Sequence, residues 1–282
     1  MSLHGRTHQR NPENLEPMNL SALFLYPIKS CRGIAVPSAT LDDFGFAGDR
    51  RWMLVDEAGV FISQREEPRL ALVEPQPGEG WMALSGPMMD PTAIRPPGQS
   101  AKRTRVRVWD DTVEALDGGA EAARWFTTFL DRPCRLMYMP DDVFRRVDPK
   151  YVPEERRVHF GDAYPVLLIG EASLADLNGR LAQPIPMNRF RPNLVVAGSK
   201  PYEEDDWQDF RIGAVRFRAV KPCDRCMTTT VDQATGIKGK EPLTTLATYR
   251  KWEGQVFFGQ NVVGEGRGEV SVGMEVEVSG KR

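Results

Sequence analysis

Two cysteines three positions apart, Cys223 and Cys226, carry the clearest chemical signal in the sequence. They enclose Asp224 and Arg225, and Lys221 precedes them at the end of a strand-like run. Nearby positive charge stabilises an ionised sulfur, so Lys221 and Arg225 favour the thiolate, the form of cysteine that binds metals and attacks substrates. A pair of ordinary reduced cysteines at a strand end fits this spacing equally well.

Other uses of these cysteines have less support. A structural zinc site needs four ligands, and the remaining candidates, Cys31, Cys134 and His159, are not paired at zinc-ligand spacing. The cysteine spacing of plant-type iron–sulfur clusters is absent. Residues 227–236, after the pair, are β-branched and turn-forming, so a thioredoxin-like dithiol is a minor alternative. We expect His159, the only histidine beyond the first 18 residues, to be a partly buried structural residue.

Several basic and polar residues in loops could bind a small anion, although each alone also fits a solvated loop or an ion pair. Arginine is preferred for bidentate phosphate contacts, and a glycine-containing loop after a strand exposes backbone donors. The acidic run 203–209 is expected to form a solvated surface loop. The candidate anion-binding residues are Lys29, Ser30, Arg50, Arg51, Arg189, Arg191 and Asn193, while Asp49 is placed to form an ion pair with the arginines that follow it.

Short strands separated by glycine and proline turns must position these residues. Alternating or continuous apolar residues predict the strands, and apolar residues at three- and four-residue spacing predict the helices. Between residues 75 and 100, frequent prolines leave only 81–85 as a predicted strand. We therefore predict a mainly β protein with attached helices (α+β) and a β-barrel-like architecture. Strands are predicted within 19–27, 51–63, 104–116, 164–170, 191–198, 210–220 and 269–280, and helices at 119–132, 171–181 and 241–252.

Length and composition limit the class of protein. The 282 residues include 37 basic and 39 acidic side chains, for a formal charge of -2, and 41% are hydrophobic. These values fit a globular chain of about two domains and argue against a nucleic acid polymer as partner. Four cysteines are too few for a disulfide scaffold, and no apolar run is long enough to span a bilayer. We expect a cytoplasmic protein without a membrane contact.

The charged, proline-punctuated segment 139–162 is the expected junction between the two domains. We predict a disordered tail at 1–18, a first domain at 19–145 and a second domain at 146–282. The tail has no apolar block and so resembles neither a secretory signal nor a membrane anchor.

The sequence resembles the MOSC family, named after the C-terminal domain of molybdenum cofactor sulfurases. The run 223–236, with 240–250 and 258–263 after it, resembles the MOSC signature. Residues 23–33, 46–73 and 188–198 resemble the N-terminal half and the arginine-asparagine strand of the same proteins. The resemblance covers residue 20 to the C-terminus and implies a MOSC N-terminal β-barrel domain followed by a MOSC β-barrel domain. The relatives that it suggests are mitochondrial amidoxime-reducing components and bacterial hydroxylaminopurine-detoxifying reductases.

The resemblance implies a molybdenum cofactor, with molybdenum bound by the thiolate of Cys226, and it also carries a family-level association with pyridoxal phosphate. By position, Lys29, Ser30 and Arg50 would bind the terminal phosphate of the molybdenum cofactor. Further residues expected around the pterin and the metal are Asp162, Arg191, Asn193, Cys223 and Arg225, of which Asp162 is also a candidate catalytic residue, as is Cys226.

The activity implied is two-electron reduction of a small N-hydroxylated substrate. Some bacterial relatives carry a C-terminal iron–sulfur domain, whereas this chain stops at Arg282. Electrons would then come from a separate ferredoxin, flavin reductase or cytochrome b5-like protein, for which the acidic loop 203–209 is a candidate docking face. One alternative is a sulfur-carrier or cofactor-carrier protein that uses a persulfide or thiolate at Cys226. Another is a binding module with incidental cysteines.

Overall fold

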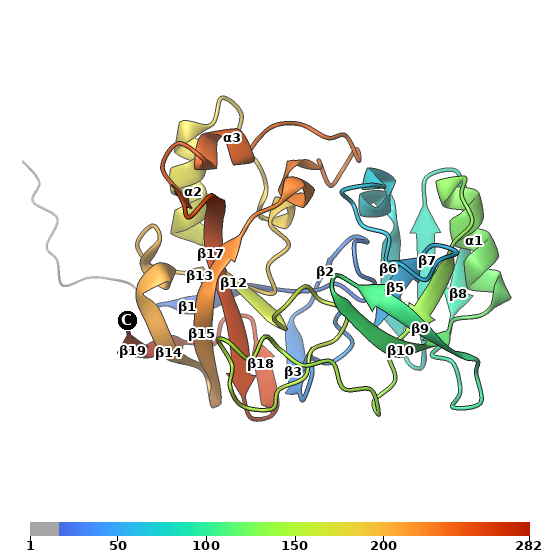
Figure 1. Cartoon of the computed structure of the whole chain (residues 1–282). Helices are drawn as coiled ribbons and strands as arrows, with labels where there is room; N and C mark the ends of the chain where they lie inside the picture. The colour runs from blue at the N-terminus through green and yellow to red at the C-terminus, as the bar shows by residue number, and fades with distance from the viewer. Residues whose placement is uncertain (1–16) are drawn as a thin grey trace, which may run out of the picture.

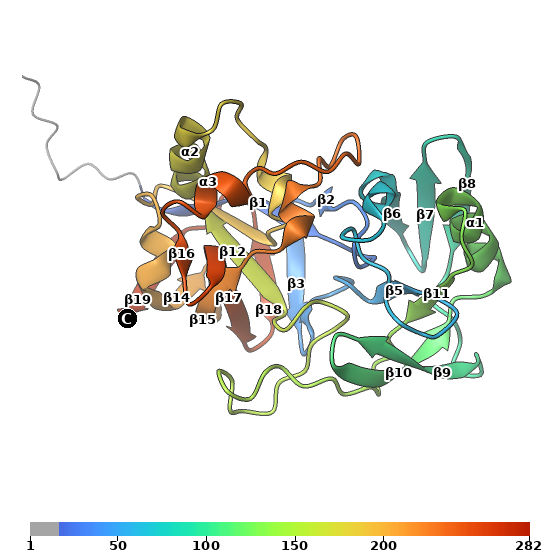
Figure 2. The same cartoon turned by 45° about the horizontal axis from the view of Figure 1, so that its top comes forward.

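The computed structural model describes residues 17–282, which form two lobes side by side (Figures 1 and 2). Residues 1–16 of the predicted tail lie outside the described residues. The predicted class is confirmed, because the described chain is mainly β with three α-helices. None of the helices in residues 17–282 has the length and apolar character that crossing a membrane requires.

The first lobe contains two antiparallel sheets and one helix. Helix α1 (Ala120–Leu130) falls within the predicted range and buries Ala122, Trp125, Phe126 and Phe129 on one face. The four-stranded sheet has the order β5-β11-β10-β9, and the three-stranded sheet has the order β6-β7-β8. The strands are β5 (Trp52–Val55), β6 (Glu74–Gly78), β7 (Trp81–Gly86), β8 (Met89–Ile94), β9 (Arg103–Val108), β10 (Asp111–Asp117) and β11 (Arg135–Tyr138).

The second lobe is built on a nine-stranded sheet with the order β19-β14-β15-β17-β12-β13-β1-β2, in which β16 pairs with β17. Only β12 and β13 pair in parallel among these strands. The strands are β1 (Asn19–Leu25), β2 (Ile34–Ala35), β12 (Val166–Gly170), β13 (Leu194–Ala197), β14 (Trp207–Ile212), β15 (Val215–Asp224), β16 (Lys251–Trp252), β17 (Gln255–Glu265) and β19 (Val276–Lys281).

A smaller sheet and several short helices complete the second lobe. The smaller sheet joins β18 (Gly268–Ser271), β3 (Ser38–Asp42) and β4 (Gly45–Phe46), so the strands in 269–280 pair with other strands and not with each other. Helix α3 (Leu243–Leu246) is much shorter than its predicted range. The remaining helices of this lobe are α2 (Glu171–Arg180), η2 (Met187–Arg189), η3 (Glu203–Asp206) and η4 (Met227–Thr230), whereas η1 (Pro68–Leu72) belongs to the first lobe.

The predicted boundary after residue 145 does not separate two cores. Strand β1 pairs with β13, and β3 pairs with β18, so the first strands of the chain belong to the second lobe. Leu20, Leu23 and Phe46 accordingly lie in one apolar core with Val166 and Phe217. A chain that begins in the second lobe must cross to the first lobe and back, and the loops at these crossings position the candidate residues.

The prediction of a solvated acidic loop at 203–209 was wrong. Glu204 is 1% exposed. Its carboxylate accepts hydrogen bonds from the Gly170 backbone N–H and the Ser173 hydroxyl. Asp205 pairs with Arg250 at 2.6 Å. Glu204 and Asp205 therefore anchor η3 to its neighbours, and Asp206 is the exposed carboxylate of this helix.

Candidate functional site

Three of the predicted anion-binding residues adopt a strained backbone. Ser30, Arg50 and Arg191 have φ angles of 70°, 44° and 56°, and only eight non-glycine residues in 17–282 have a positive φ. Each such residue costs on the order of 1–3 kcal/mol and persists only where its surroundings fix it, a pattern that clusters at functional sites. The Arg50 backbone N–H, for example, donates to the Tyr26 carbonyl at 2.8 Å.

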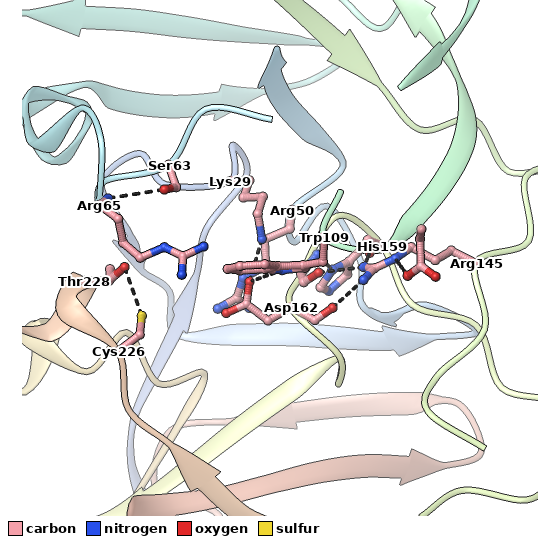
Figure 3. Close-up of polar contacts among 12 residues, drawn as sticks. Lys29, Arg50, Ser63, Arg65, Trp109, Arg145, His159, Asp162, Cys226 and Thr228 are labelled. Carbon is pink, nitrogen blue, oxygen red and sulfur yellow. Dashed lines mark hydrogen bonds and ion pairs between the residues drawn. The ribbon is translucent and has the colours of Figure 1, made fainter. Parts of the chain in front are cut away.

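Lys29 lies in the loop after β1, where the chain crosses to the first lobe (the crossing loop), and Asp162 lies in the segment before β12. The two side chains form an ion pair (Figure 3). Lys29 Nζ lies 2.6 Å from Asp162 Oδ1, to which Trp109 Nε1 also donates at 3.1 Å. Loss of hydration opposes ionisation of Asp162, but the Lys29 charge and the two hydrogen bonds outweigh it and hold its pKa well below the usual range. Burial lowers the pKa of Lys29, which Asp162 partly restores. Asp162 is therefore a permanent carboxylate that holds two side chains.

Arg50 is held by a buried carboxylate and a buried amide. The Asp49 carboxylate accepts hydrogen bonds from the Arg50 guanidinium and from the Tyr26 backbone N–H. His159 Nε2 lies 3.1 Å from Asp49 Oδ2. Burial would raise the pKa of Asp49, but Arg50 and His159 lower it overall. Asn193 Oδ1 accepts from Arg50 at 3.0 Å. Because Asn193 is 0% exposed, its amide is fixed and positions Arg50. His159 is also 0% exposed, so it is fully buried and not partly buried as expected.

Two guanidinium groups share the ring of Tyr26. Arg50 and Arg191 lie 4.6 and 4.3 Å from its centroid. Burial raises the pKa of Tyr26 to about 12, although both arginines oppose this shift. Arg191 donates to the Cys31 carbonyl at 2.7 Å and has no carboxylate partner within residues 17–282. The arrangement leaves positive charge that the described side chains do not neutralise.

The two signature cysteines differ in their environments. Cys226 is exposed, and its thiol donates to Thr228 Oγ1 at 3.4 Å. Cys223 is half-buried, and burial raises its pKa to about 11. Arg225 donates through Nε to the Phe258 carbonyl at 2.8 Å, whereas its Nη2 is buried without a partner in the described part of the chain. Cys226 is thus the accessible sulfur, and Arg225 keeps an unused donor.

Predicted residues from both lobes lie in one region, whereas Arg51 bonds to the Met139 carbonyl and Arg189 to the Thr229 and Glu241 carbonyls. Figure 3 places Cys226 and Thr228 on one side of a gap and Lys29, Arg50 and Asp162 on the other. The charge of Asp162 also raises the pKa of Cys223, which connects the two sides electrostatically. Ser30 accepts a hydrogen bond from Gln64 at its backbone carbonyl at 2.6 Å, and its hydroxyl has no partner in the part of the chain that the structure describes.

Sequence reasoning missed Trp109, Arg65 and the pair Gln64 and Gln233. Trp109 stands in the turn between β9 and β10 with a φ of 55° and carries the indole that reaches Asp162. The aspartates after Trp109 predict a turn at this position, but nothing in the sequence indicates that the indole reaches Asp162. The two glutamines bond across the lobes, which no local pattern encodes.

Comparison with known proteins covers both halves of the chain. Residues 18–133 match the family described as MOSC N-terminal beta barrel domain, and residues 155–277 match the MOSC domain. Mitochondrial amidoxime-reducing component 1 of Xenopus laevis is 35% identical over 259 residues, which cover 87% of this chain and 76% of that protein. Mitochondrial amidoxime reducing component 2 of Rattus norvegicus is 38% identical over 258 residues, with the same coverage. A crystal structure of the YuaD protein from Bacillus subtilis aligns over 94% of this chain and 97% of its own with a TM-score of 0.45 and 11% identity.

Proposed function

Because the chain belongs to the MOSC family that includes the mitochondrial amidoxime-reducing components, we propose that it is a molybdenum-cofactor-dependent reductase of N-hydroxylated compounds. The observation that carries the proposal is the exposed thiol of Cys226 facing a cluster of cations across one gap (Figure 3). The reaction converts R–NH–OH, two electrons and two protons into R–NH₂ and water. The electrons come from a separate protein.

The residues present fit a phosphorylated, metal-bearing cofactor. Within residues 17–282, Lys29 and Arg50 pair with the carboxylates of Asp162 and Asp49, and Arg191 has no carboxylate partner. A doubly charged phosphate would balance this excess through charge-assisted hydrogen bonds. The orphaned Nη2 of Arg225 is a further donor for a polar ligand atom. A soft thiolate such as that of Cys226 suits molybdenum.

When bound, the cofactor supplies the two electrons and an oxygen-accepting metal. The side chains of this protein would divide the remaining work. Cys226 binds the metal, while Lys29 and Arg50 hold the phosphate. Asp162 stays ionised, so it orients Lys29 and does not act as the proton donor. Cys223 is half-buried whereas Cys226 is exposed, so Cys226 is the sulfur that we assign to the metal.

Removal of each cysteine in turn tests this assignment. Cys226→Ala, expressed in a host that makes the cofactor, should lose its molybdenum while keeping the fold of the native protein. Cys223→Ala is the matched control, because it removes a neighbouring thiol that we do not assign to the metal. Full retention of molybdenum by Cys226→Ala, or equal loss from both variants, would refute the role of Cys226.

A carrier of sulfur or of the cofactor is the second candidate, and the exposure of the Cys226 thiol favours it. Such a protein would hold a persulfide or the cofactor for delivery without turnover. An anaerobic assay with reduced viologen dye and a hydroxylamine separates the two functions, since only a reductase oxidises the dye. A protein that copurifies with no pterin from a competent host would instead be a binding module.

The electron donor and the compartment belong to the proposal as well. We propose a ferredoxin, a flavin reductase or a cytochrome b5-like protein as donor, and the cytoplasm as compartment, whereas the names of the relatives above state that those proteins are mitochondrial. In the acidic run 203–209, Glu203 pairs with Lys281 at 3.5 Å. Measuring turnover with each class of donor in excess identifies the one that the protein accepts.

A further inference from the structure

Arg65 is a cation without an anionic partner at the edge of the candidate site. It lies in the loop between β5 and η1, is half-buried, and its guanidinium has no hydrogen-bond acceptor within residues 17–282. Its recorded side-chain contact is with the ring of Trp109, at 4.1 Å from the centroid. Arg69 in the same segment differs, because it bonds to Glu67 and to two backbone carbonyls.

The loop that carries Arg65 is held in place from the other lobe. The Arg65 backbone N–H donates to Ser63 Oγ at 3.3 Å, and Lys238 donates to the Arg65 carbonyl. The neighbouring Gln64 exchanges two hydrogen bonds with Gln233, at 3.2 and 3.0 Å. Both glutamines are at most 5% exposed. The unpaired guanidinium therefore extends from a fixed backbone.

The platform beneath Arg65 is fixed as well. Trp109 donates its indole N–H to Asp162, the same carboxylate that holds Lys29. A cation–π contact holds a guanidinium over the ring while its five N–H donors stay free. Figure 3 shows the Arg65 side chain reaching into the gap between Cys226 and Asp162, where a substrate would approach the proposed metal ligand.

We propose that Arg65 is a specificity-determining residue that binds an anionic oxygen group, such as a carboxylate, on the N-hydroxylated substrate. The inference rests on the proposed function. The planar guanidinium matches a carboxylate in bidentate geometry. Lys29 and Arg50 already supply the cations for a cofactor phosphate from the crossing loop and the segment before β5, whereas Arg65 comes from a different loop on the side that faces Cys226. Its charge is thus available to the substrate.

A matched pair of substrates tests this role in the loaded enzyme. Benzamidoxime and 4-carboxybenzamidoxime differ by one carboxylate. Arg65→Ala should lower kcat/KM for the carboxylate substrate by at least about tenfold, mainly through KM, as expected for one lost charge-assisted contact. The neutral substrate should change less than about twofold. Arg65→Lys should recover part of the loss, because it restores the charge without the fork. Arg105→Ala, on the exposed face of β9, is the control of equal charge and should alter neither substrate.

Binding measurements give a readout that does not depend on turnover. Calorimetry should show that 4-carboxybenzamidine binds the native protein more tightly than benzamidine does, and that Arg65→Ala removes this preference. Equal losses for both substrates, or no change in either, would overturn the proposal. Loss of molybdenum and pterin from Arg65→Ala would also overturn it, because Arg65 would then hold the cofactor. If the protein reduces no N-hydroxylated compound, the reductase proposal fails, while the calorimetric preference still decides whether Arg65 binds carboxylates.

Discussion

Replacing Asp162 with asparagine removes the only carboxylate that pairs with the Lys29 ammonium within residues 17–282, while the amide oxygen can still accept a hydrogen bond. The Lys29 side chain is 7% exposed, so the variant leaves a nearly buried cation without its counter-charge. The rings of Phe61 and Trp109, 5.2 and 5.6 Å from Nζ, and the neutral amide oxygen compensate only part of the lost charge. Arg50 and Arg145, whose charges already lower the pKa of Lys29, add repulsion. Asp162→Asn should therefore destabilise the folded protein.

The size of this effect follows from the unequal exposure of the two partners. Breaking a fully buried pair costs about 3–5 kcal/mol, whereas an exposed pair contributes about 0–1 kcal/mol. The Asp162 side chain is 74% exposed and its charge is screened by water, so the expected loss lies near the lower figure. We expect the unfolding free energy at pH 7 to fall by about 1–2 kcal/mol.

The loss should depend on pH in a defined direction. The pKa of Asp162 is lower in the folded state, so its contribution is complete above the unfolded pKa of about 3.9 and is lost as the pH falls through the folded value. The pKa of Lys29 is also lowered, and the substitution lowers it further. A cation penalised in this way is relieved as the pH rises toward the unfolded pKa of about 10.4. The difference between native protein and variant should be largest at intermediate pH.

Urea denaturation across this pH range measures the difference. Asp141→Asn is the matched control, because Asp141 is 84% exposed and lies 2.7 Å from Arg51, which is 10% exposed. Arg51 keeps two hydrogen bonds to the Met139 carbonyl, so this variant should change stability by less than about 0.5 kcal/mol. Equal effects of the two substitutions, or a loss at Asp162 that does not vary with pH, would refute the reasoning.

Three further substitutions test the supports of the site. Gln64→Leu should cost about 1–3 kcal/mol of unfolding free energy, because Gln233 keeps a buried amide without its partner, and urea denaturation of the double leucine variant should show less than additive loss. Asn193→Ala should lower the unfolding free energy by about 1–3 kcal/mol, because it removes the acceptor of Arg50 and of the Leu167 backbone N–H. It should also lower the pterin content, because Arg50 loses its support; an unchanged pterin content would contradict the positioning role of Asn193. Gly259→Ala should lower the melting temperature strongly, because φ is +75° and the new Cβ would lie 2.7 Å from a carbonyl oxygen of β12; a stable variant would show that β12 can shift.

Local patterns were sufficient for elements whose signal lies within one segment. Helix α1 follows from the apolar spacing in 119–132, and the hairpin of β9 and β10 from alternation around a turn. The sequence does not predict strands β6 and β8, because frequent prolines between residues 75 and 100 are typical of irregular structure. Pro75 and Pro77 stand two residues apart on β6, and both β6 and β8 are edges of their sheet, where a strand can lack N–H donors on its outer side.

The site was predictable only as separate fragments. Lys29, Arg50 and Cys226 could each be selected by residue type and motif, but their meeting depends on a crossing between lobes that has no local code. Asn193 illustrates the limit, since its type suggested a ligand contact and the fold buries it beneath Arg50. Arg65 could not be selected from the sequence, because an arginine beside acidic residues in a loop is typical of a solvated surface. Only the fold places it over the ring of Trp109.

Strain and charge coincide at the crossing between the lobes, and together they argue for a ligand. A fold selected for stability alone would place glycine or asparagine at left-handed positions, yet Arg50 and Arg191 occupy two of them. Both also hold their charges against one aromatic ring, where they repel each other. Asp49 offsets part of this repulsion at Arg50, whereas Arg191 has no carboxylate partner within residues 17–282. An anion that bound between them would offset both, because a ligand that binds only the folded state stabilises it by mass action.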